Sequence, residues 1–307
     1  MAKLVLGPEI SIGISAYGNT TVTQHCLNCL LDSTDGDYEL ILVDDCSPDN
    51  GETTNLFRSV VPRHRNTKLF SFSRNLEYSG SLNCILSHAI GEFVVFISND
   101  IYVTPNYLAE MIYVAKSDDS IGIVRGVSNF VDNGKSTHNI DTSGHIKTLA
   151  DIPQFSAFVQ DANRGGVLIE NYLTGDAFLV KRSVINAIGT FDPMFYGYFA
   201  DHDYGIRVCR AGFKLAVAKG AFAFHHAATN FEYLAEAHRT QKLNGRFAKV
   251  HENWARFKLK YGFPVSLLYP GMNEINWDLL NHPSDSQMKD YFVAKGNYSE
   301  YLLSAGD

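Results

Sequence analysis

No stretch of the 307-residue sequence is apolar over the roughly 20 residues that a membrane-spanning helix needs. Residues 1–8 also lack the basic start and apolar core of a secretory signal. We therefore expect a cytoplasmic protein with no transmembrane segment. Peripheral contact with the inner face of a membrane and assembly into a homo-oligomer are both compatible with the sequence.

Cysteine is scarce and scattered. The five cysteines, an odd number, suit a reducing compartment better than a disulfide framework; they are Cys26, Cys29, Cys46, Cys84 and Cys209. Cys26 and Cys29 form a C-x-x-C, but no second ligand pair accompanies them. Val22 and Leu30 continue their spacing at a helical period, so we interpret the pair as part of a helix's apolar stripe.

Excess positive charge is also missing. The formal net charge is −7 at pH 7, which argues against a nucleic-acid partner bound through net charge. Apolar residues make up 45% of the chain, enough for a large core. The length exceeds that of an average domain, but α/β folds of this size commonly form one unit.

Strand and helix signals alternate in the first half of the chain. Expected strands cover 9–15, 38–43, 67–72, 93–97 and 121–124, and expected helices cover 20–31, 51–60, 82–89 and 108–115. This alternation predicts a mostly parallel sheet with right-handed crossovers. In such sheets, ligands bind beyond the carboxyl ends of the strands.

The second half is less regular. Residues 128–171 are polar and weakly periodic, and we expect a long loop or subdomain that closes over a substrate. A helix is expected over 202–211 between short strands, and a charged helix over 231–261. The basic residues of that last helix are interpreted as a solvated face, with contact to anionic lipid as the alternative.

Carboxylates follow two of the expected strands. Asp44 and Asp45 follow a buried strand, and adjacent carboxylates are costly to desolvate unless something binds them. One can accept hydrogen bonds from a nucleobase or a ribose while another caps a turn or helix. Asn99 and Asp100 end the most apolar strand and offer oxygen ligands to a cation on a diphosphate, although these residue types also end ordinary strands.

Two further groups follow downstream. Asp201 and Asp203 straddle the expected start of a helix, where a carboxylate can cap the helix or act as a general base. His225 and His226 follow a short strand, and a neutral imidazole can complete a metal shell or serve a structural role.

The order and spacing of these signals resemble the family 2 glycosyltransferases, particularly the rhamnosyltransferase-like and galactofuranosyltransferase-like branch. The resemblance runs from about residue 8 to 230. The segments that carry it include ISIGISAYGN (10–19), DDCSPD (44–49), NLEYSGSLN (75–83), GEFVVFISND (91–100), GDAFLVKR (175–182), ADHDYGIR (200–207) and HENWARFKLKYG (251–262).

The resemblance implies a GT-A fold and an inverting, metal-dependent transfer from a nucleotide-diphosphate sugar to a saccharide or lipid-linked acceptor, in cell-surface polysaccharide synthesis. It implies a catalytic domain over 1–230 and a helical extension with a tail over 231–307. It also implies Mn²⁺ or Mg²⁺ as cofactor, held by Asp100 and His225, and Asp201 as the general base. The implied nucleotide-binding residues are Ser15, Tyr17, Asp45, Asn75, Asn83 and Asn99, and those on the acceptor or donor-sugar side are Gly175, Asp176 and Asp203.

The chain departs from the family pattern at three positions. Asn99 stands at the usual first aspartate of the metal motif, Glu77 at a glycine, and Ala200 at the glutamate of E-D-x-D. Because Asn99 and Ala200 replace family carboxylates, a non-catalytic protein that binds nucleotide sugars or carbohydrates is an alternative. A sugar nucleotidyltransferase is a second one, but the turn at 16–19 does not supply the Gly-rich, Arg-containing phosphate loop of that class.

Overall fold

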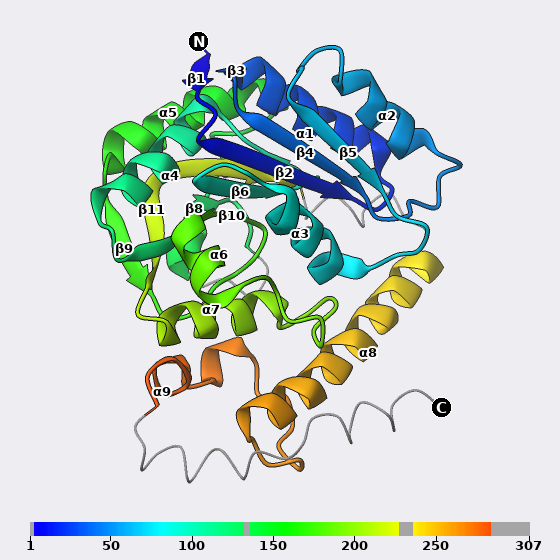
Figure 1. The fold of residues 1–307 in the computed structure, drawn as a ribbon, viewed down its shortest axis with the longest axis vertical. Coiled ribbons are helices and arrows are strands. Elements are labelled where there is room, and N and C mark those ends of the chain that lie inside the picture. Colours follow the sequence, from blue (N-terminus) through cyan, green and yellow to red (C-terminus); the bar gives the residue numbers. More distant parts are fainter. Residues whose placement is uncertain (1–2, 132–135, 227–235, 284–307) are drawn as a thin grey trace.

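The structure, a computed structural model, describes residues 3–131, 136–226 and 236–283. A single large sheet runs through it, with helices on both faces (Figure 1). A small parallel pair, β1 (Leu4–Leu6) and β3 (Thr34–Gly36), lies beside this sheet. Among the residues that the structure describes, no helix is both long and apolar enough to cross a membrane.

The first half of the chain forms the parallel part of the sheet. Strands β5, β4, β2 and β6 are neighbours in that order and run parallel. These elements are β2 (Ile10–Ala16), α1 (Thr20–Ser33), β4 (Glu39–Asp44), α2 (Glu52–Val60), β5 (Thr67–Ser71), α3 (Glu77–His88) and β6 (Phe93–Ser98). The strand–helix alternation predicted from the sequence is confirmed here.

The second half makes the sheet mixed. Strand β10 is inserted antiparallel between β6 and β8, and β11 pairs parallel to β8 but antiparallel to β7 and β9. The bounds are β7 (Ile101–Tyr102), α4 (Pro105–Ser117), β8 (Ile121–Ser128), β9 (Val167–Glu170), β10 (Ala177–Lys181), α6 (Arg182–Ile188), α7 (Ala200–Arg210) and β11 (Lys214–His225).

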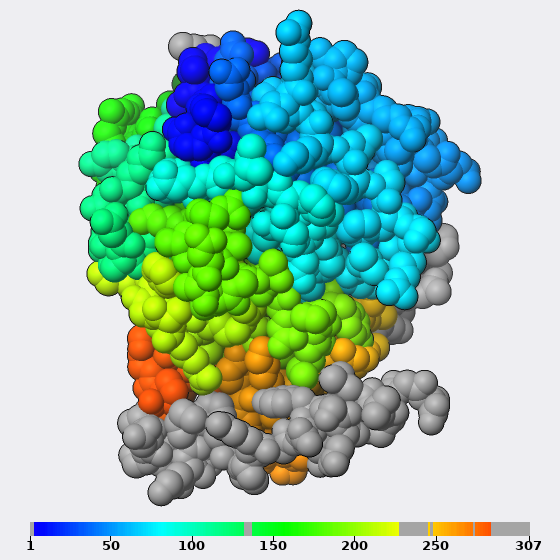
Figure 2. Space-filling model, viewed as in Figure 1, coloured from blue at the N-terminus to red at the C-terminus, as the bar shows by residue number. Residues whose placement is uncertain are grey.

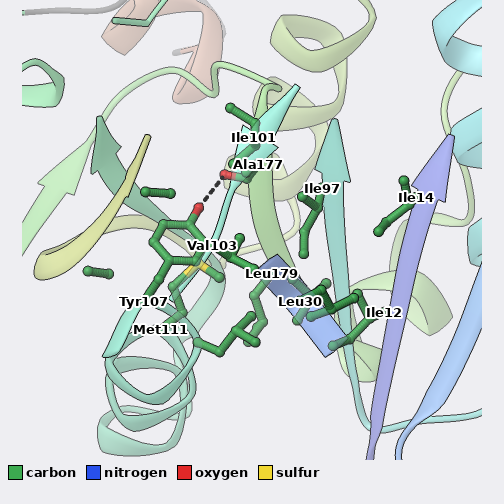
Figure 3. Close-up of a cluster of buried hydrophobic side chains, with 14 of the residues drawn as sticks. Ile12, Ile14, Leu30, Ile97, Ile101, Val103, Tyr107, Met111, Ala177 and Leu179 are labelled. Carbon is green, nitrogen blue, oxygen red and sulfur yellow. Dashed lines mark hydrogen bonds between the residues drawn. The ribbon is translucent and has the colours of Figure 1, made fainter. Parts of the chain in front are cut away.

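Alternating side chains of each strand supply two cores, one on each face of the sheet. In β4, Leu40 and Leu42 face the core beneath α1, α2, α4 and α5 (Ile152–Asn163), whereas Ile41 and Val43 face the core beneath α3, α6 and α7. This alternation is the period of two that a doubly covered strand must have. Figure 3 shows the first core, where the Tyr107 hydroxyl donates to the Ala177 carbonyl at 3.3 Å.

The C-x-x-C lies within α1. Cys26 is fully buried in the first core and Cys29 packs at its edge. Neither is disulfide-bonded. Burial raises the pKa of the Cys29 thiol to about 11, which leaves it protonated at neutral pH. The interpretation as an apolar helix stripe is therefore confirmed.

The segment 128–171 contains more regular structure than its sequence suggested. It holds two short 3-10 turns, α5 (Ile152–Asn163) and β9. Ile152, Phe155 and Val159 of α5 are buried in the first core, at the spacing of one helix face. Of the two expected alternatives, a long loop or a subdomain, the structure fits the subdomain, and the polar residues around this short stripe obscured its helical period.

The C-terminal part packs onto the second core. Helix α8 (Glu236–Tyr261) and helix α9 (Trp277–Asn281) place Trp254, Phe257 and Trp277 among its buried side chains. The boundary expected at residue 230 lies outside the described residues, so the division into two domains stays a prediction. In the space-filling view the orange extension lies directly against the green segment that precedes β11 (Figure 2).

Basic residues of α8 do not all form the solvated face that we expected. Lys260 contacts Asp192 at 2.6 Å, and Arg256 donates to the Met194 carbonyl at 2.7 Å. Lys249 forms an ion pair with Glu77 at 2.5 Å. These three side chains tie α8 to the rest of the protein. The side chains of Arg239, Lys242 and Arg246 lie outside the described part.

Replacement of Phe257 by alanine tests this packing. Phe257 is fully buried between Phe199 and Tyr261, with ring centroids 5.1 and 4.6 Å away. We expect Phe257→Ala to lower the free energy of unfolding by about 3–5 kcal/mol, the usual cost of removing a buried phenyl ring. Urea unfolding measures this, with the exposed Phe158→Ala as the matched control. Equal losses in the two variants would contradict the packing of α8 onto the core.

Candidate functional site

The carboxyl ends of the parallel strands converge as predicted. Ser15, at the end of β2, pairs with Val43 of β4 on one side and with Ser98 of β6 on the other. The backbone N–H of Asp45 donates to the Ala16 carbonyl at 2.9 Å. The strand register therefore brings Ser15, Asp45 and the segment after Ser98 to one edge of the sheet.

The two adjacent aspartates have different partners. Asp44 accepts a hydrogen bond from the backbone N–H of Ser47 at 2.9 Å and another from the Thr54 hydroxyl, so it holds the turn. Asp45 accepts the backbone N–H of Leu76 at 2.6 Å. Burial raises the pKa of Asp45 from 3.8 to about 6, although that hydrogen bond opposes the rise. The hydrogen bonds that Asp45 accepts therefore offset only part of the free-energy cost of burying its charge.

Asp100 and His225 meet because β7 pairs with β11. Ile101 lies opposite His225 in this ladder, and the backbone N–H of His226 donates to the Asp100 carbonyl at 2.9 Å. The two side chains approach to 3.4 Å between Asp100 Oδ2 and His225 Nε2. The His226 ring instead packs on Tyr102, with centroids 5.6 Å apart. The structure therefore pairs Asp100 with His225 as expected.

The environment of His225 suits a metal ligand. Its Nδ1 lies 2.9 Å from the Phe130 carbonyl, a contact that needs a proton on Nδ1 and leaves Nε2 directed at Asp100. Burial disfavours the charged imidazolium, but the hydrogen bond with Asp100 and its charge outweigh burial and raise the pKa of His225. A divalent cation bound at Nε2 would take the place of the proton that this nitrogen carries in the imidazolium form.

The spacing of the pair also fits Mn²⁺ or Mg²⁺. Two ligands about 2.1 Å from one cation and at right angles are roughly 3 Å apart, close to the observed 3.4 Å. Within the described ranges, no group of three or more His, Cys, Asp or Glu side chains is placed to hold a metal. A cation held by this pair would need phosphate oxygens and water to complete its coordination.

A cavity of about 360 Å³ opens between α3, α7 and α8. Its lining includes Tyr78, Gly175, Asp176, Asp201, His202 and Lys249. The Tyr78 hydroxyl donates to the Gly175 carbonyl at 2.6 Å. A Cβ atom on Gly175 would lie 2.0 Å from that hydroxyl oxygen, so only glycine fits at this position.

Asp176 lies both at the cavity and beside the Asp100–His225 pair, the candidate metal pair. Its Oδ2 lies 3.8 Å from His225 Nδ1, and its Oδ1 lies 2.9 Å from the guanidinium of the buried Arg125. Arg125 also donates to the Thr174 carbonyl at 3.1 Å. Sequence analysis missed Arg125, although an arginine within the apolar strand 121–128 is a signal, because a buried charge needs a partner.

Asp201 and Asp203 face different surroundings. Asp201 lies in the first turn of α7 and lines the cavity. Asp203 is 0% exposed, accepts hydrogen bonds from Arg207 at 2.9 Å and Tyr261 at 2.7 Å, and also contacts Lys260. The structure does not bring Asp203 to the cavity, since these contacts turn it toward the core. Its expected place on the acceptor or donor-sugar side is corrected accordingly.

Two predicted nucleotide-binding asparagines make contacts within the protein. Asn83 exchanges two hydrogen bonds with the backbone of Phe191, at 2.9 and 2.7 Å, so it braces the loop before α7. The side chain of Asn75 accepts the backbone N–H of Glu77 at 2.6 Å. Both side chains therefore support the backbone around α3, and the Asn83 amide already has two partners within the protein.

The remaining predicted residues lie near the sheet edge. Asn99 donates from its amide to the Thr23 hydroxyl at 2.8 Å, so that amide is fixed to α1. Ser15 is half-buried, and Tyr17 is 51% exposed in the turn after β2. Ser15 and Tyr17 are accessible beside Asp45, whereas the Asn99 amide already has a partner.

Comparison with known proteins agrees with this geometry. The model of the family described as glycosyl transferase family 2 matches residues 11–189, more than half of the chain. The chain is also similar to the N-acetylglucosaminyl-diphospho-decaprenol L-rhamnosyltransferase of Mycobacterium tuberculosis (strain H37Rv). That relative is 22% identical over 244 residues, which cover 71% of this chain and 79% of the relative.

Solved structures show the fold. The mannosyltransferase PcManGT of Pyrobaculum calidifontis, in complex with GDP-Man and Mn²⁺, aligns over 98% of this chain and 80% of its own, with a TM-score of 0.54 and 16% identity. GalNAc-T7 with UDP, GalNAc and Mn²⁺ aligns over 70% of this chain but only 42% of its own, with a TM-score of 0.53 and 13% identity. The predicted GT-A fold is confirmed. The chain belongs to glycosyl transferase family 2 and is a glycosyltransferase.

Proposed function

We propose that the protein is an inverting, divalent-metal-dependent transferase that moves a sugar from a nucleotide diphosphate to a hydroxyl of a saccharide or lipid-linked acceptor. Asp176 carries the proposal, because it lines the cavity beside Asp201 and lies 3.8 Å from His225 of the metal pair. The name of the mycobacterial relative supports a lipid-linked acceptor. The Mn²⁺ in the mannosyltransferase complex supports the metal.

Each group has one task in this proposal. The Asp45 carboxylate accepts a hydrogen bond from the N–H of the nucleobase and fixes the donor at the sheet edge. Asp100 and His225 hold the cation, which when bound neutralises charge on the leaving diphosphate. Asp201 removes the proton of the acceptor hydroxyl, whose oxygen attacks the anomeric carbon opposite the diphosphate. Attack from the opposite face inverts that carbon.

Asp201→Asn tests the base. We expect kcat to fall by about 10²–10⁴, the usual contribution of a general base, because the amide cannot take up the proton. Nucleoside diphosphate release from UDP-N-acetylglucosamine, GDP-mannose or dTDP-L-rhamnose, whichever the unaltered protein consumes, measures kcat. The exposed Asp161→Asn is the matched control. Normal turnover by Asp201→Asn, or donor binding without any turnover by the unaltered protein, contradicts the proposal.

His225→Ala tests the metal pair, with the adjacent His226→Ala as its control. We expect only His225→Ala to abolish the rise in melting temperature that Mn²⁺ gives in the presence of UDP or GDP, because binding stabilises the native state. The Mn²⁺ affinity of the unaltered protein should decline with falling pH already above about 6.5, since the raised pKa of His225 makes protons compete earlier. An Mn²⁺ response that survives His225→Ala would contradict this assignment.

Asp45→Asn tests the buried carboxylate. The folded pKa of Asp45, about 6, exceeds its ordinary value of 3.8, so the folded state binds more protons between these values and loses stability as pH rises through them. We expect Asp45→Asn to stabilise the protein at pH 7 by on the order of 2 kcal/mol, to be neutral near pH 4, and to weaken UDP or GDP binding. Urea unfolding at both pH values and calorimetric titration check this, and equal stability changes at the two pH values would refute it.

A further inference from the structure

His202 is a buried imidazole that the sequence motifs did not single out. It follows Asp201 in the first turn of α7, is 4% exposed and lines the cavity. Its Nδ1 lies 2.8 Å from Asp201 Oδ1. Within the described part of the chain, neither ring nitrogen has another hydrogen-bond partner, and the Nδ1 contact is close but not well aligned.

Aromatic rings fix the plane of this imidazole. It stacks on Tyr172, with centroids 5.7 Å apart and planes at 18°, and on Trp277, at 5.2 Å and 27°. The Trp277 indole N–H donates to the Met272 carbonyl at 2.9 Å, so α9 is anchored beside the cavity. These contacts leave the ring little freedom to turn away from Asp201.

Packing alone does not explain a histidine at this position. A phenyl ring would make the same stacking contacts without burying two polar nitrogens, and an unsatisfied buried polar group costs about 1–3 kcal/mol. The backbone N–H of His202 also donates to Asp201 Oδ1, at 3.0 Å. The backbone N–H and the ring Nδ1 of His202 therefore both lie within 3.0 Å of the same carboxylate oxygen.

We propose that His202 is a positioning residue, which donates from Nδ1–H to Asp201 Oδ1 and keeps Oδ2 turned to the acceptor hydroxyl. This inference rests on the proposed function. In the step that it supports, the hydroxyl proton moves to Asp201 Oδ2, and the hydroxyl oxygen bonds to the anomeric carbon. The bond from that carbon to the diphosphate oxygen breaks, and the diphosphate takes the electron pair. His202 neither gains nor loses a proton. His202 thereby gives the base Asp201 a contact that Ala200, which stands at the position of the family glutamate, does not provide.

Three substitutions separate positioning from packing. His202→Phe keeps an aromatic ring and removes both nitrogens, His202→Asn places an N–H near the position of Nδ1, and His202→Gln places one near Nε2. We expect His202→Phe and His202→Gln to lower kcat roughly 10–100-fold, as the loss of an outer partner of a reactive group does, while the KM for the donor stays within about twofold. His202→Asn should restore most of kcat. The assay is nucleoside diphosphate release from the donor used for Asp201→Asn.

Four results would overturn the inference: normal kcat in His202→Phe, equal losses in all three variants, rescue by Gln instead of Asn, or a loss confined to KM. In a background of Asp201→Asn, His202→Phe should add little, because the two residues act as a unit. A full additional loss counts against the inference. Failure of the proposed function looks different, because Asp201→Asn itself then turns over normally.

A readout without substrate accompanies the kinetics. The ¹⁵N chemical shifts of His202, recorded on protein with labelled histidine and assigned by comparison with His202→Phe, report which ring nitrogen carries a proton. We expect the Nδ1–H form in the unaltered protein. An Nε2–H form would overturn the inference whether or not a donor has been found, because Nδ1 would then face the carboxylate as an acceptor.

Discussion

The antiparallel insertion of β10 between β6 and β8 is the constraint on which the site depends. It places Ala177 opposite Ile97, and the Asp176 carbonyl accepts the backbone N–H of Ser98 at 3.0 Å. A segment nearly eighty residues downstream of β6 therefore lies beside the end of that strand. The β7–β11 ladder then adds His225 from a still later strand. Without these two pairings the parallel half would carry Asp45 and Asp100, but neither the cavity wall at Asp176 nor the His225 side chain beside Asp100.

The buried acids of this region differ in how their charge is compensated. This difference distinguishes acids that stabilise the fold from an acid that is available to a ligand. Asp203 has Arg207 and Lys260, and Asp176 has Arg125, so each has a cation in contact. Among the described residues, Asp45 has N–H and hydroxyl partners and no cation in contact, and burial raises its pKa to about 6. A carboxylate that the fold leaves without a cation is costly for stability, which is the pattern expected of a group reserved for a ligand.

Sequence periodicity predicted the parallel half because each strand and helix there is a local pattern. It did not predict the direction of β10 or the helix α5, since pairing over long sequence distances leaves no local period. Motif order pointed to Asp45, Asp100, Asp201 and His225, which lie at the sheet edge or the cavity. It pointed equally to Asp203 and Asn83, whose side chains bond within the protein, because a motif identifies a position in the chain and not the direction of a side chain. Hydrogen bonds from Arg207 and Tyr261 set the direction of the Asp203 side chain, and hydrogen bonds with the Phe191 backbone set that of Asn83.

Two of the three departures from the family pattern, Glu77 and Ala200, lie in helices that contact the C-terminal extension, whereas Asn99 contacts Thr23 of α1. Glu77 stands at a family glycine and keeps a positive φ of 60°, a conformation that costs a non-glycine residue free energy. Its carboxylate forms the ion pair with Lys249 of α8. Ala200 stands at a family glutamate, and the neighbouring His202 stacks on Trp277 of α9. Both compensating contacts come from helices beyond residue 230, and Lys249 lines the cavity itself. The extension therefore supplies part of the cavity wall, next to two positions at which the chain departs from the family pattern.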